Sequence, residues 1–235
     1  MVPSEHTSKQ FDTELEAVRA QVLQMGGLVE DQIRLAIEAL INSDAALMRR
    51  VIADDHRVNA MEVAIDETCN QIIALRQPAA RDLRLIIMII KTITDLERIG
   101  DEAEKIARMG LLQLQHDNPI LPRFTEIKHT SELVLDMLRK SLDAFARLDL
   151  SYAAQVVRQD EEVDEQFRFI MRYLITFMME YPRTISTALE TLFVAKALER
   201  IGDHAKNMSE YVVYMVKGKD VRHVTVEEIE REVRQ

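Results

Sequence analysis

The sequence predicts an all-α protein, a tandem pair of homologous three-helix bundles made of six long antiparallel helices. Three observations support this prediction. Only 6 Gly and 5 Pro occur among 235 residues, while 47% of the residues are apolar and 30% are charged, a composition typical of helices and poor in turn formers. Apolar residues recur at helical spacing almost throughout the chain. Long stretches of the first half also recur, in the same order, in the second half.

Three helices are expected in the first half. The first has one apolar stripe over residues 11–40, which corresponds to roughly 45 Å of helix at 1.5 Å per residue. It stops before Asp44, which is suited to cap the next helix. That second helix is expected over about 45–75, until Pro78 breaks the chain, and the third over about 81–113.

Three more helices are expected in the second half. The segment 116–122 contains two of the five prolines and predicts the boundary between the halves. Helices then follow over about 123–148, 151–180 and 185–216, with the second of these broken from the third at Tyr181-Pro182. Lys217-Gly218-Lys219 ends the last helix with cations and a glycine.

These boundaries divide the chain into a first bundle over residues 1–117, a second over 118–219 and a tail over 220–235. The tail contains a weak capping box at Thr225 and Glu228, and it is interpreted as a short helix or a frayed end.

The repeat is the strongest sign of this organisation. At a shift of 102 residues, the stretch 96–103 matches 198–205 at seven of eight positions. At a shift of 105, the stretch 51–59 aligns with 156–164. Because the elements keep their order, the two halves are interpreted as copies of one three-helix unit, joined internally by short connections.

Composition excludes several classes of protein. One Cys excludes an internal disulfide framework and a cysteine-rich zinc module. The first ten residues lack the apolar core of a secretion signal, and the longest apolar run, 85–90, is far too short to span a membrane. A soluble, cytoplasmic protein is therefore expected. The net charge of −10 argues against nucleic-acid binding and favours metal cations or a basic protein surface.

The repeated stretch carries a pair of carboxylates. Glu97 and Asp101 are four residues apart, so both lie on one helix face, and Glu199 and Asp203 repeat the pair. Like charges at this spacing destabilise a helix slightly. Each pair also encloses a glycine, which costs about 1 kcal/mol relative to Ala inside a helix. A motif kept twice despite these costs indicates a compensating cation and a close approach by a backbone or a ligand.

The second helix of each half offers partners for these pairs. Asp55 and Asn59 share one face of the first, and Asp160 and Asp164 occupy the same positions in the second. If the second and third helices of each half pack together, four oxygen-bearing side chains meet at one crossing. Oxygen ligands suit divalent cations such as Mg, Mn or Fe, whereas Zn, which prefers His or Cys, fits less well.

Two alternatives remain open. Arg98 and Arg200 could pair with these carboxylates, which would make the motifs purely structural. A metal-dependent enzyme could instead use the clustered carboxylates to activate water, with His204 as the nearby candidate base.

No Glu-x-x-His spacing follows Glu97 or Glu199, which argues against a ferritin-like di-iron site. No nucleotide-binding glycine loop or serine-hydrolase motif occurs either.

The motifs resemble those of the PhoU family of bacterial phosphate-signalling proteins, and the resemblance covers nearly the whole chain. The matching segments, besides the two Glu-Arg-Ile-Gly-Asp motifs, are Met25-Gly26-Gly27, Val58-Asn59-Ala60-Met61-Glu62, Arg76-Gln77-Pro78, Asp82-Leu83-Arg84 and Tyr181-Pro182-Arg183-Thr184-Ile185.

The resemblance implies paired three-helix bundles with a Glu/Asp-x-x-x-Asp metal motif. In this sequence the motif falls on Glu97/Asp101, Glu199/Asp203 and Asp160/Asp164. The first half departs from it at one position, because Asp55 is followed by Asn59 rather than by a second Asp, so that one ligand there is neutral.

The resemblance also implies a regulator rather than an enzyme. Such a protein restrains phosphate uptake and keeps the phosphate-starvation response off when phosphate is plentiful. It links the phosphate ABC transporter, through its ATPase subunit, to a phosphate-sensing histidine kinase, and meets membrane complexes only through these partners. A homodimer is also implied. A metal-dependent hydrolase acting on phosphate compounds remains the alternative function.

Overall fold

The computed structural model describes residues 9–116, 125–221, 224 and 228, and these residues form helices and no strands. This confirms the all-α prediction. The elements are α1 (Lys9–Asn42), α2 (Ala45–Asp54), α3 (His56–Arg76), α4 (Ala80–Gln113), α5 (Thr125–Arg147), α6 (Leu150–Glu180), the short 3-10 helix η1 (Pro182–Thr184) and α7 (Ile185–Lys217).

The expected second helix is the one that the structure corrects, because it is divided into α2 and α3 at Asp55. The backbone of Asp55 keeps helical angles (φ −59°, ψ −36°). The helical ladder restarts there, however, since the N–H of Val58 donates to the carbonyl of Asp55 at 2.9 Å, a bond across three residues. The apolar period continues across this interruption, so the pattern alone gave no sign of it.

The predicted helix ends are confirmed where the structure describes them. Asp44 accepts hydrogen bonds from the N–H groups of Ala46 and Leu47 at 2.9 and 3.0 Å, and Asp149 caps α6 in the same way. Gly218 ends α7 with φ +74°, a left-handed conformation that favours glycine. The boundary segment and the tail were predicted over residues most of which lie outside the described ranges.

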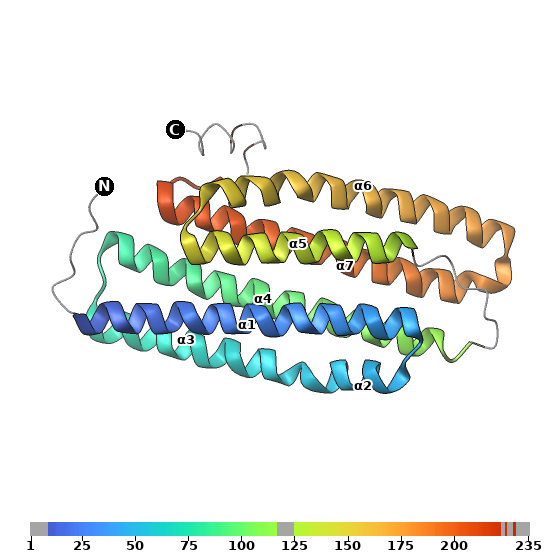
Figure 1. Cartoon of the computed structure of the whole chain (residues 1–235), viewed down its shortest axis with the longest axis horizontal. Helices are drawn as coiled ribbons and strands as arrows, with labels where there is room; N and C mark the ends of the chain where they lie inside the picture. The colour runs from blue at the N-terminus through green and yellow to red at the C-terminus, as the bar shows by residue number, and fades with distance from the viewer. Residues whose placement is uncertain (1–8, 117–124, 222–223, 225–227, 229–235) are drawn as a thin grey trace.

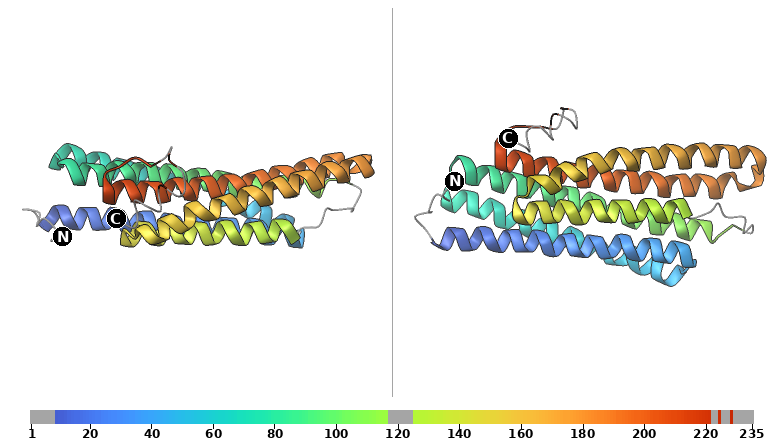
Figure 2. Two further views of the ribbon diagram at one scale, coloured as in Figure 1. Left: turned by 90° about the horizontal axis from the view of Figure 1, so that it is seen from above. Right: turned by 45° about the horizontal axis from the view of Figure 1, so that its top comes forward.

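The two halves lie side by side along their length and run in opposite directions (Figure 1). Figure 2 shows the same arrangement from two further directions, with α4 and α7 adjacent. The most extensive contact between the halves is α4 against α7, and α1 packs against α5 beside it. The start of each long helix in one half therefore lies near the end of its counterpart in the other half.

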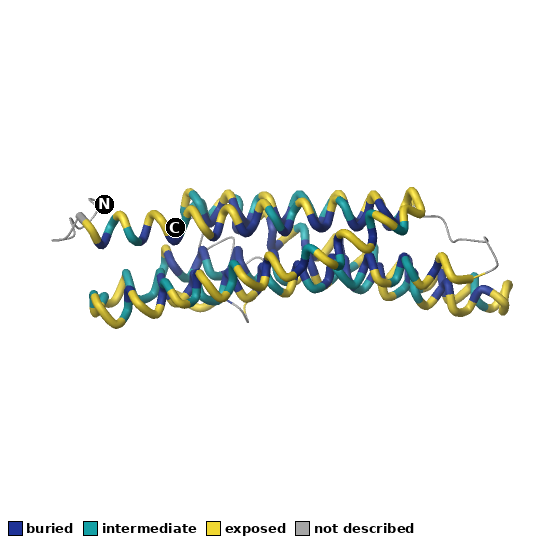
Figure 3. The backbone as a smooth tube through the Cα atoms, turned by 90° about the horizontal axis from the view of Figure 1, so that it is seen from below, coloured by how far each residue is buried: buried dark blue, intermediate teal, exposed yellow. Residues whose placement is uncertain are grey.

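Buried apolar residues from both halves form one continuous core. The buried stripe of each helix faces the neighbouring helices, while the exposed stripe faces outward (Figure 3). Ile99 and Ile201, which occupy equivalent positions in the repeated motif, are both fully buried. The apolar positions of the motif thus anchor α4 and α7, and its acidic positions are left for the faces that meet α3 and α6.

Polar contacts cross the contact between α4 and α7. His204 Nδ1 lies 2.7 Å from a carboxylate oxygen of Asp95, and Asn207 donates to the same oxygen at 3.3 Å. Arg200 pairs with Glu102 at 3.1 Å. Asp95 and Glu102 are both buried, so these contacts satisfy carboxylates that would otherwise be costly to bury. They also fix the register in which the middles of the two helices meet.

Among the described helices, none combines the length and the apolar character needed to cross a membrane.

Candidate functional site

Five carboxylates gather where α3 begins beside the middle of α4, and we call them the first cluster: Asp55, Glu62, Glu97, Asp101 and Glu104. Burial raises the pKa of Asp55, and the negative charges of Glu104 and Asp101 raise it further. Burial likewise raises the pKa of Glu97, together with the charges of Asp101, Glu62 and Asp55. These mutual effects show that the acids predicted on separate helices are brought together.

Gly100 forms the floor of this cluster. A Cβ atom at this position would lie 3.2 Å from Gln32 Oε1 and 3.4 Å from Asp55 Oδ1. Gln32 is 3% exposed, and its Oε1 is buried without a hydrogen-bond partner, while its Nε2 donates to Asp55 at 3.4 Å. A buried carbonyl oxygen without a donor costs about 1–3 kcal/mol. Its position beside a carboxylate oxygen is suited to a cation ligand.

Asn59 and Arg98 also contact carboxylates of the first cluster. Asn59 donates to Asp55 at 3.3 Å, so the predicted neutral position does lie beside Asp55. Arg98 approaches Glu97 and Asp101 at 3.5 and 3.4 Å but is more than half exposed. An exposed arginine of this kind compensates clustered carboxylates only weakly.

The second cluster consists of Asp160, Asp164, Glu199 and Asp203, on α6 and α7, and it contains built-in cations. Lys206 donates to the buried Asp160 at 2.7 Å. Lys196 reaches both carboxylate oxygens of Glu199 at 2.5 Å. All four predicted acids are again brought near one another, but two ammonium groups already compensate them.

The pKa of Asp203 is raised to about 6 in this setting. Partial desolvation by the neighbouring helices is the largest cause, although Asp203 itself is exposed, followed by the negative charge of Glu199 and then that of Asp160, while Lys196 acts against the shift. Burial alone would lower the pKa of Lys206, but its hydrogen bond and attraction to Asp160 raise it instead. The lysine therefore stays charged within the cluster.

The two clusters occupy equivalent places in the repeat but have diverged in charge. Glu104 of the first half corresponds to Lys206, an exchange of an acid for a base. Gln32, whose Oε1 has no hydrogen-bond partner, corresponds to Met137, whose Sδ and Cε lie 3.7 Å from a Cβ placed on Gly202. The first half thus has more carboxylates and an extra oxygen donor, and the second has ammonium and thioether groups. Oxygen donors bind hard divalent cations, whereas an ammonium group competes with them.

A cation fits the first cluster by this donor chemistry. As the described side chains lie, however, no three Asp, Glu, His or Cys residues among them converge closely enough to hold a metal ion. Gln32 Oε1 and Asp55 Oδ1 are the two donors that already flank one point above Gly100. Glu97 and Asp101 would complete such a site from α4.

The sequence predicted Asp55, Glu97 and Asp101, but it did not single out Glu104 of the first cluster or Gln32 beside it. Glu104 lies seven residues after Glu97 and so shares its helix face, a signal that was present in the sequence. Gln32 had no such signal, because a glutamine on a long amphipathic helix resembles any polar surface residue. His204, the candidate base of the enzyme alternative, instead pairs with Asp95 between the two halves.

Substituting Asp203 by Asn is expected to stabilise the metal-free protein near pH 7.5. The pKa of the folded state, about 6, lies above the ordinary value of 3.8, so the folded state binds the proton more tightly than the unfolded state. The stability linked to that proton is complete below about pH 4 and is lost as the pH rises through 6. Thermal melts in EDTA should show the variant above the wild type at pH 7.5 and the two together at pH 4. An equal difference at both pH values would contradict the predicted charge repulsion.

The chain matches a known protein family and individual proteins of that family. The PhoU domain family matches it twice, over residues 22–109 and 127–212. The chain is 48% identical to the phosphate-specific transport system accessory protein PhoU of Escherichia coli K12, over 97% of this chain and 94% of that protein. It is also 48% identical to the protein of the same name from Edwardsiella tarda, over 97% and 93% of the two chains.

Two solved structures share the fold. One is a crystal structure of PhoU from Pseudomonas aeruginosa, with a TM-score of 0.85 and 47% identity over 89% of this chain and all of that one. The other is the phosphate transport system regulatory protein PhoU from Streptococcus pneumoniae, with a TM-score of 0.84 and 31% identity over 90% and 99% of the two chains.

Proposed function

The chain belongs to the PhoU family, and from this premise we propose that it is a negative regulator of phosphate uptake and of the phosphate-starvation response. Its relatives are named as accessory proteins of the phosphate-specific transport system, and they match along nearly the whole chain. The role proposed here within that system is that of an adaptor between the phosphate ABC transporter and a phosphate-sensing histidine kinase.

The observation that carries this proposal is the match to accessory proteins of phosphate transport over nearly the whole chain. Among the described hydrogen bonds of the two clusters, carboxylates meet Gln, Asn, Thr, Lys and Arg side chains and no His or Cys. The preference for a regulator over a metal-dependent hydrolase rests on the match to these transport accessory proteins.

We further propose that the first cluster holds a divalent cation, Mg, Mn or Fe, with Zn less suited. Asp55, Glu97, Asp101 and Gln32 would supply its oxygen ligands from α3, α4 and α1. A bound cation would neutralise carboxylates that now repel one another, and would tie three helices of the first half together. The second cluster achieves a similar compensation with Lys196 and Lys206.

The partners follow from the family and the surface. In the proposal, the protein acts in the cytoplasm as a homodimer, and it reaches the membrane only by binding the ATPase subunit of the transporter and the kinase. The net charge of −10 favours basic faces on these partners and disfavours nucleic acid.

The regulatory role is tested by deleting the gene in the source organism and measuring transcripts of phosphate-starvation genes in medium rich in phosphate. Derepression is expected, and the wild-type gene should restore repression. Complementation with a Glu97→Gln/Asp101→Asn variant separates the two proposals, because repression by this variant would retain the regulator and remove the metal from its mechanism. Unchanged repression in the deletion strain would contradict the proposed function.

A further inference from the structure

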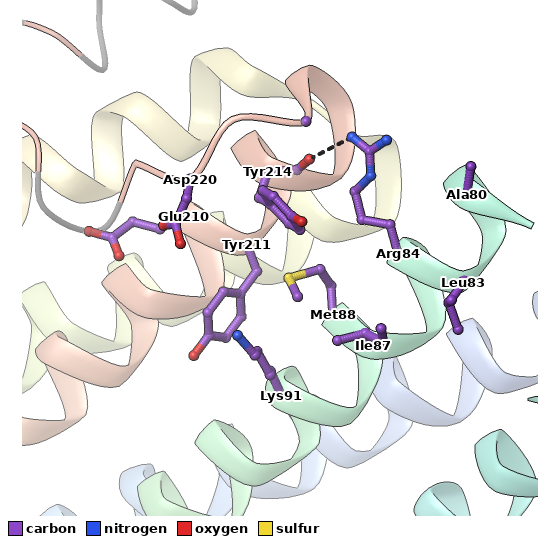
Figure 4. A pocket seen from close by; sticks show the side chains of 11 residues that line it. Ala80, Leu83, Arg84, Ile87, Met88, Lys91, Glu210, Tyr211, Tyr214 and Asp220 are labelled. Carbon is purple, nitrogen blue, oxygen red and sulfur yellow. Dashed lines mark hydrogen bonds between the residues drawn. The ribbon is translucent and has the colours of Figure 1, made fainter.

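A cavity of about 480 Å³ lies between the first half of α4 and the last turns of α7, away from both acidic clusters. Figure 4 shows Arg84 and Lys91 on its α4 side and Tyr211 and Tyr214 on its α7 side. The Arg84 guanidinium lies 5.6 Å from the centre of the Tyr214 ring, and the Lys91 ammonium lies 5.5 Å from the centre of the Tyr211 ring. A volume of this size suits a ligand of nucleotide dimensions.

The two cations of this cavity are not neutralised. Neither Arg84 nor Lys91 forms an ion pair with any residue that the structure describes, and their contacts are the tyrosine rings and one hydrogen bond from Arg84 to the carbonyl of Tyr214 at 3.4 Å. A guanidinium has five N–H donors, so most of the Arg84 donors are available to a ligand. The cavity thus presents two half-buried cations that form no ion pair, in a chain with a net charge of −10.

Arg84 is also held in place by the end of α7. Its Nη1 lies 2.4 Å from the position that a Cβ on residue 218 would take, so the glycine there makes room for the guanidinium. A cation near the last carbonyls of a helix is stabilised by the helix dipole. The arginine is therefore positioned before any ligand arrives, which lowers the entropy lost on binding.

The repeat supplies an internal comparison for this cavity. A second cavity, of about 440 Å³, lies at the equivalent place between the end of α4 and the start of α7. At a shift of 102 residues, Arg84 and Lys91 correspond to Ser186 and Phe193, and Tyr211 and Tyr214 correspond to Met109 and Leu112. The shared fold therefore requires neither the two cations nor the tyrosines at these four positions, since the equivalent cavity has serine, phenylalanine, methionine and leucine there.

We propose that the cavity between Arg84, Lys91, Tyr211 and Tyr214 binds a nucleoside polyphosphate. Arg84 and Lys91 are seven residues apart on one helix, so their backbones are roughly 10 Å apart along its axis. That separation exceeds one phosphate group and suits a chain of two or three. Arginine and lysine are the side chains that bind phosphate oxygens best in proteins.

The rest of the lining suits a nucleoside. Ile87 and Met88, between the two cations on α4, and Leu83 beside Arg84 add apolar lining, against which a planar base can pack. Glu210 and Asp220 border the cavity away from Arg84 (Figure 4). Their charges disfavour phosphate at that end, while carboxylate oxygens accept hydrogen bonds from ribose hydroxyls and amino groups. The ligand is thereby oriented with its phosphates toward Arg84 and Lys91.

Isothermal titration calorimetry of the full chain with ATP tests this site. EDTA in the buffer prevents a metal at the acidic clusters from contributing heat. Saturable binding is expected, with Kd at least about tenfold weaker in Arg84→Gln and in Lys91→Gln, since each removes charge-assisted hydrogen bonds. Arg81→Gln is the matched control, because Arg81 is an exposed cation one turn before Arg84 that does not line the cavity. Melting curves establish that each variant is folded, and Lys91→Gln serves if Arg84→Gln is not.

Adenosine and pyrophosphate, titrated separately, are expected to bind at least about tenfold more weakly than ATP, because each lacks half of the contacts. Pyrophosphate binding as tightly as ATP would overturn the nucleoside assignment. Absence of ATP binding up to millimolar concentration, or equal binding by wild type, Arg84→Gln and Lys91→Gln, would overturn the site itself. The binding measurement is independent of the transcript measurement, so the site and the proposed regulatory role succeed or fail separately.

Discussion

Replacing Lys206 by Met is expected to lower the free energy of unfolding by about 2 kcal/mol at pH 7 without metal. The substitution leaves the buried Asp160 without its partner at 2.7 Å. Removing one member of a buried ion pair costs roughly 3–5 kcal/mol, and the cost here is smaller because the Lys206 side chain is 33% exposed. Urea denaturation in EDTA measures the change.

Glu104→Met in the first half is the matched control for Lys206→Met. Glu104 occupies the equivalent position, and its charge raises the pKa of Asp55. Removing it relieves repulsion in the first cluster and gives up only a pair with the largely exposed Arg108. This variant is expected to be as stable as the wild type or slightly more stable. Similar losses in both variants would contradict the opposite electrostatic roles of the two positions.

Replacing Gln32 by Met is expected to change the response of the protein to metal. Without metal, the stability should change by less than about 1 kcal/mol, because removing a buried oxygen that has no hydrogen-bond partner is offset by losing the Gln32 hydrogen bond to Asp55. With Mn²⁺ at about 100 times its Kd, the wild type should gain about 2.7 kcal/mol. The variant should lose most of that gain, since Gln32 Oε1 is one of the donors beside Gly100.

The reciprocal variant Met137→Gln gives the second half the amide of the first. It should destabilise the metal-free protein, because the methionine it replaces is fully buried, and it should not create a metal response while Lys206 remains. Thermal melts with and without Mn²⁺ compare both variants with the wild type. An unchanged metal-induced shift in Gln32→Met would exclude Gln32 from the site.

The fold was largely predictable because the information for it is local and repeated. Apolar periodicity, Asp44 as a cap and Pro78 as a break placed the helices within a few residues of their observed ends. The interruption at Asp55 was not predictable, since it does not disturb the apolar stripe. The packing of α4 along α7 was equally hidden, because the buried Asp95 and the half-buried His204 that meet there look like ordinary polar positions in the sequence.

The acids of the two clusters could be predicted from the sequence, but the differences between the clusters could not. Repetition of the Glu-Arg-Ile-Gly-Asp motif identified Glu97, Asp101 and their counterparts. Helical spacing then indicated that these acids face the second helix of the same half. The replacement of Glu104 by Lys206 in the second half could be interpreted only from the structure, which places Glu104 near the buried Asp55 and Lys206 beside the buried Asp160. Gln32 lies on a helix far from the motif in sequence, so only the three-dimensional packing brings it there.

We propose above that the first cluster, rather than the second, binds a divalent cation. Equilibrium dialysis against Mn²⁺ followed by elemental analysis tests it on three proteins: wild type, Glu97→Gln/Asp101→Asn and Glu199→Gln/Asp203→Asn. We expect bound metal in the wild type, the same amount in the Glu199/Asp203 variant, and its loss in the Glu97/Asp101 variant. Loss of metal from the Glu199/Asp203 variant alone, or equal metal content in all three proteins, would contradict it.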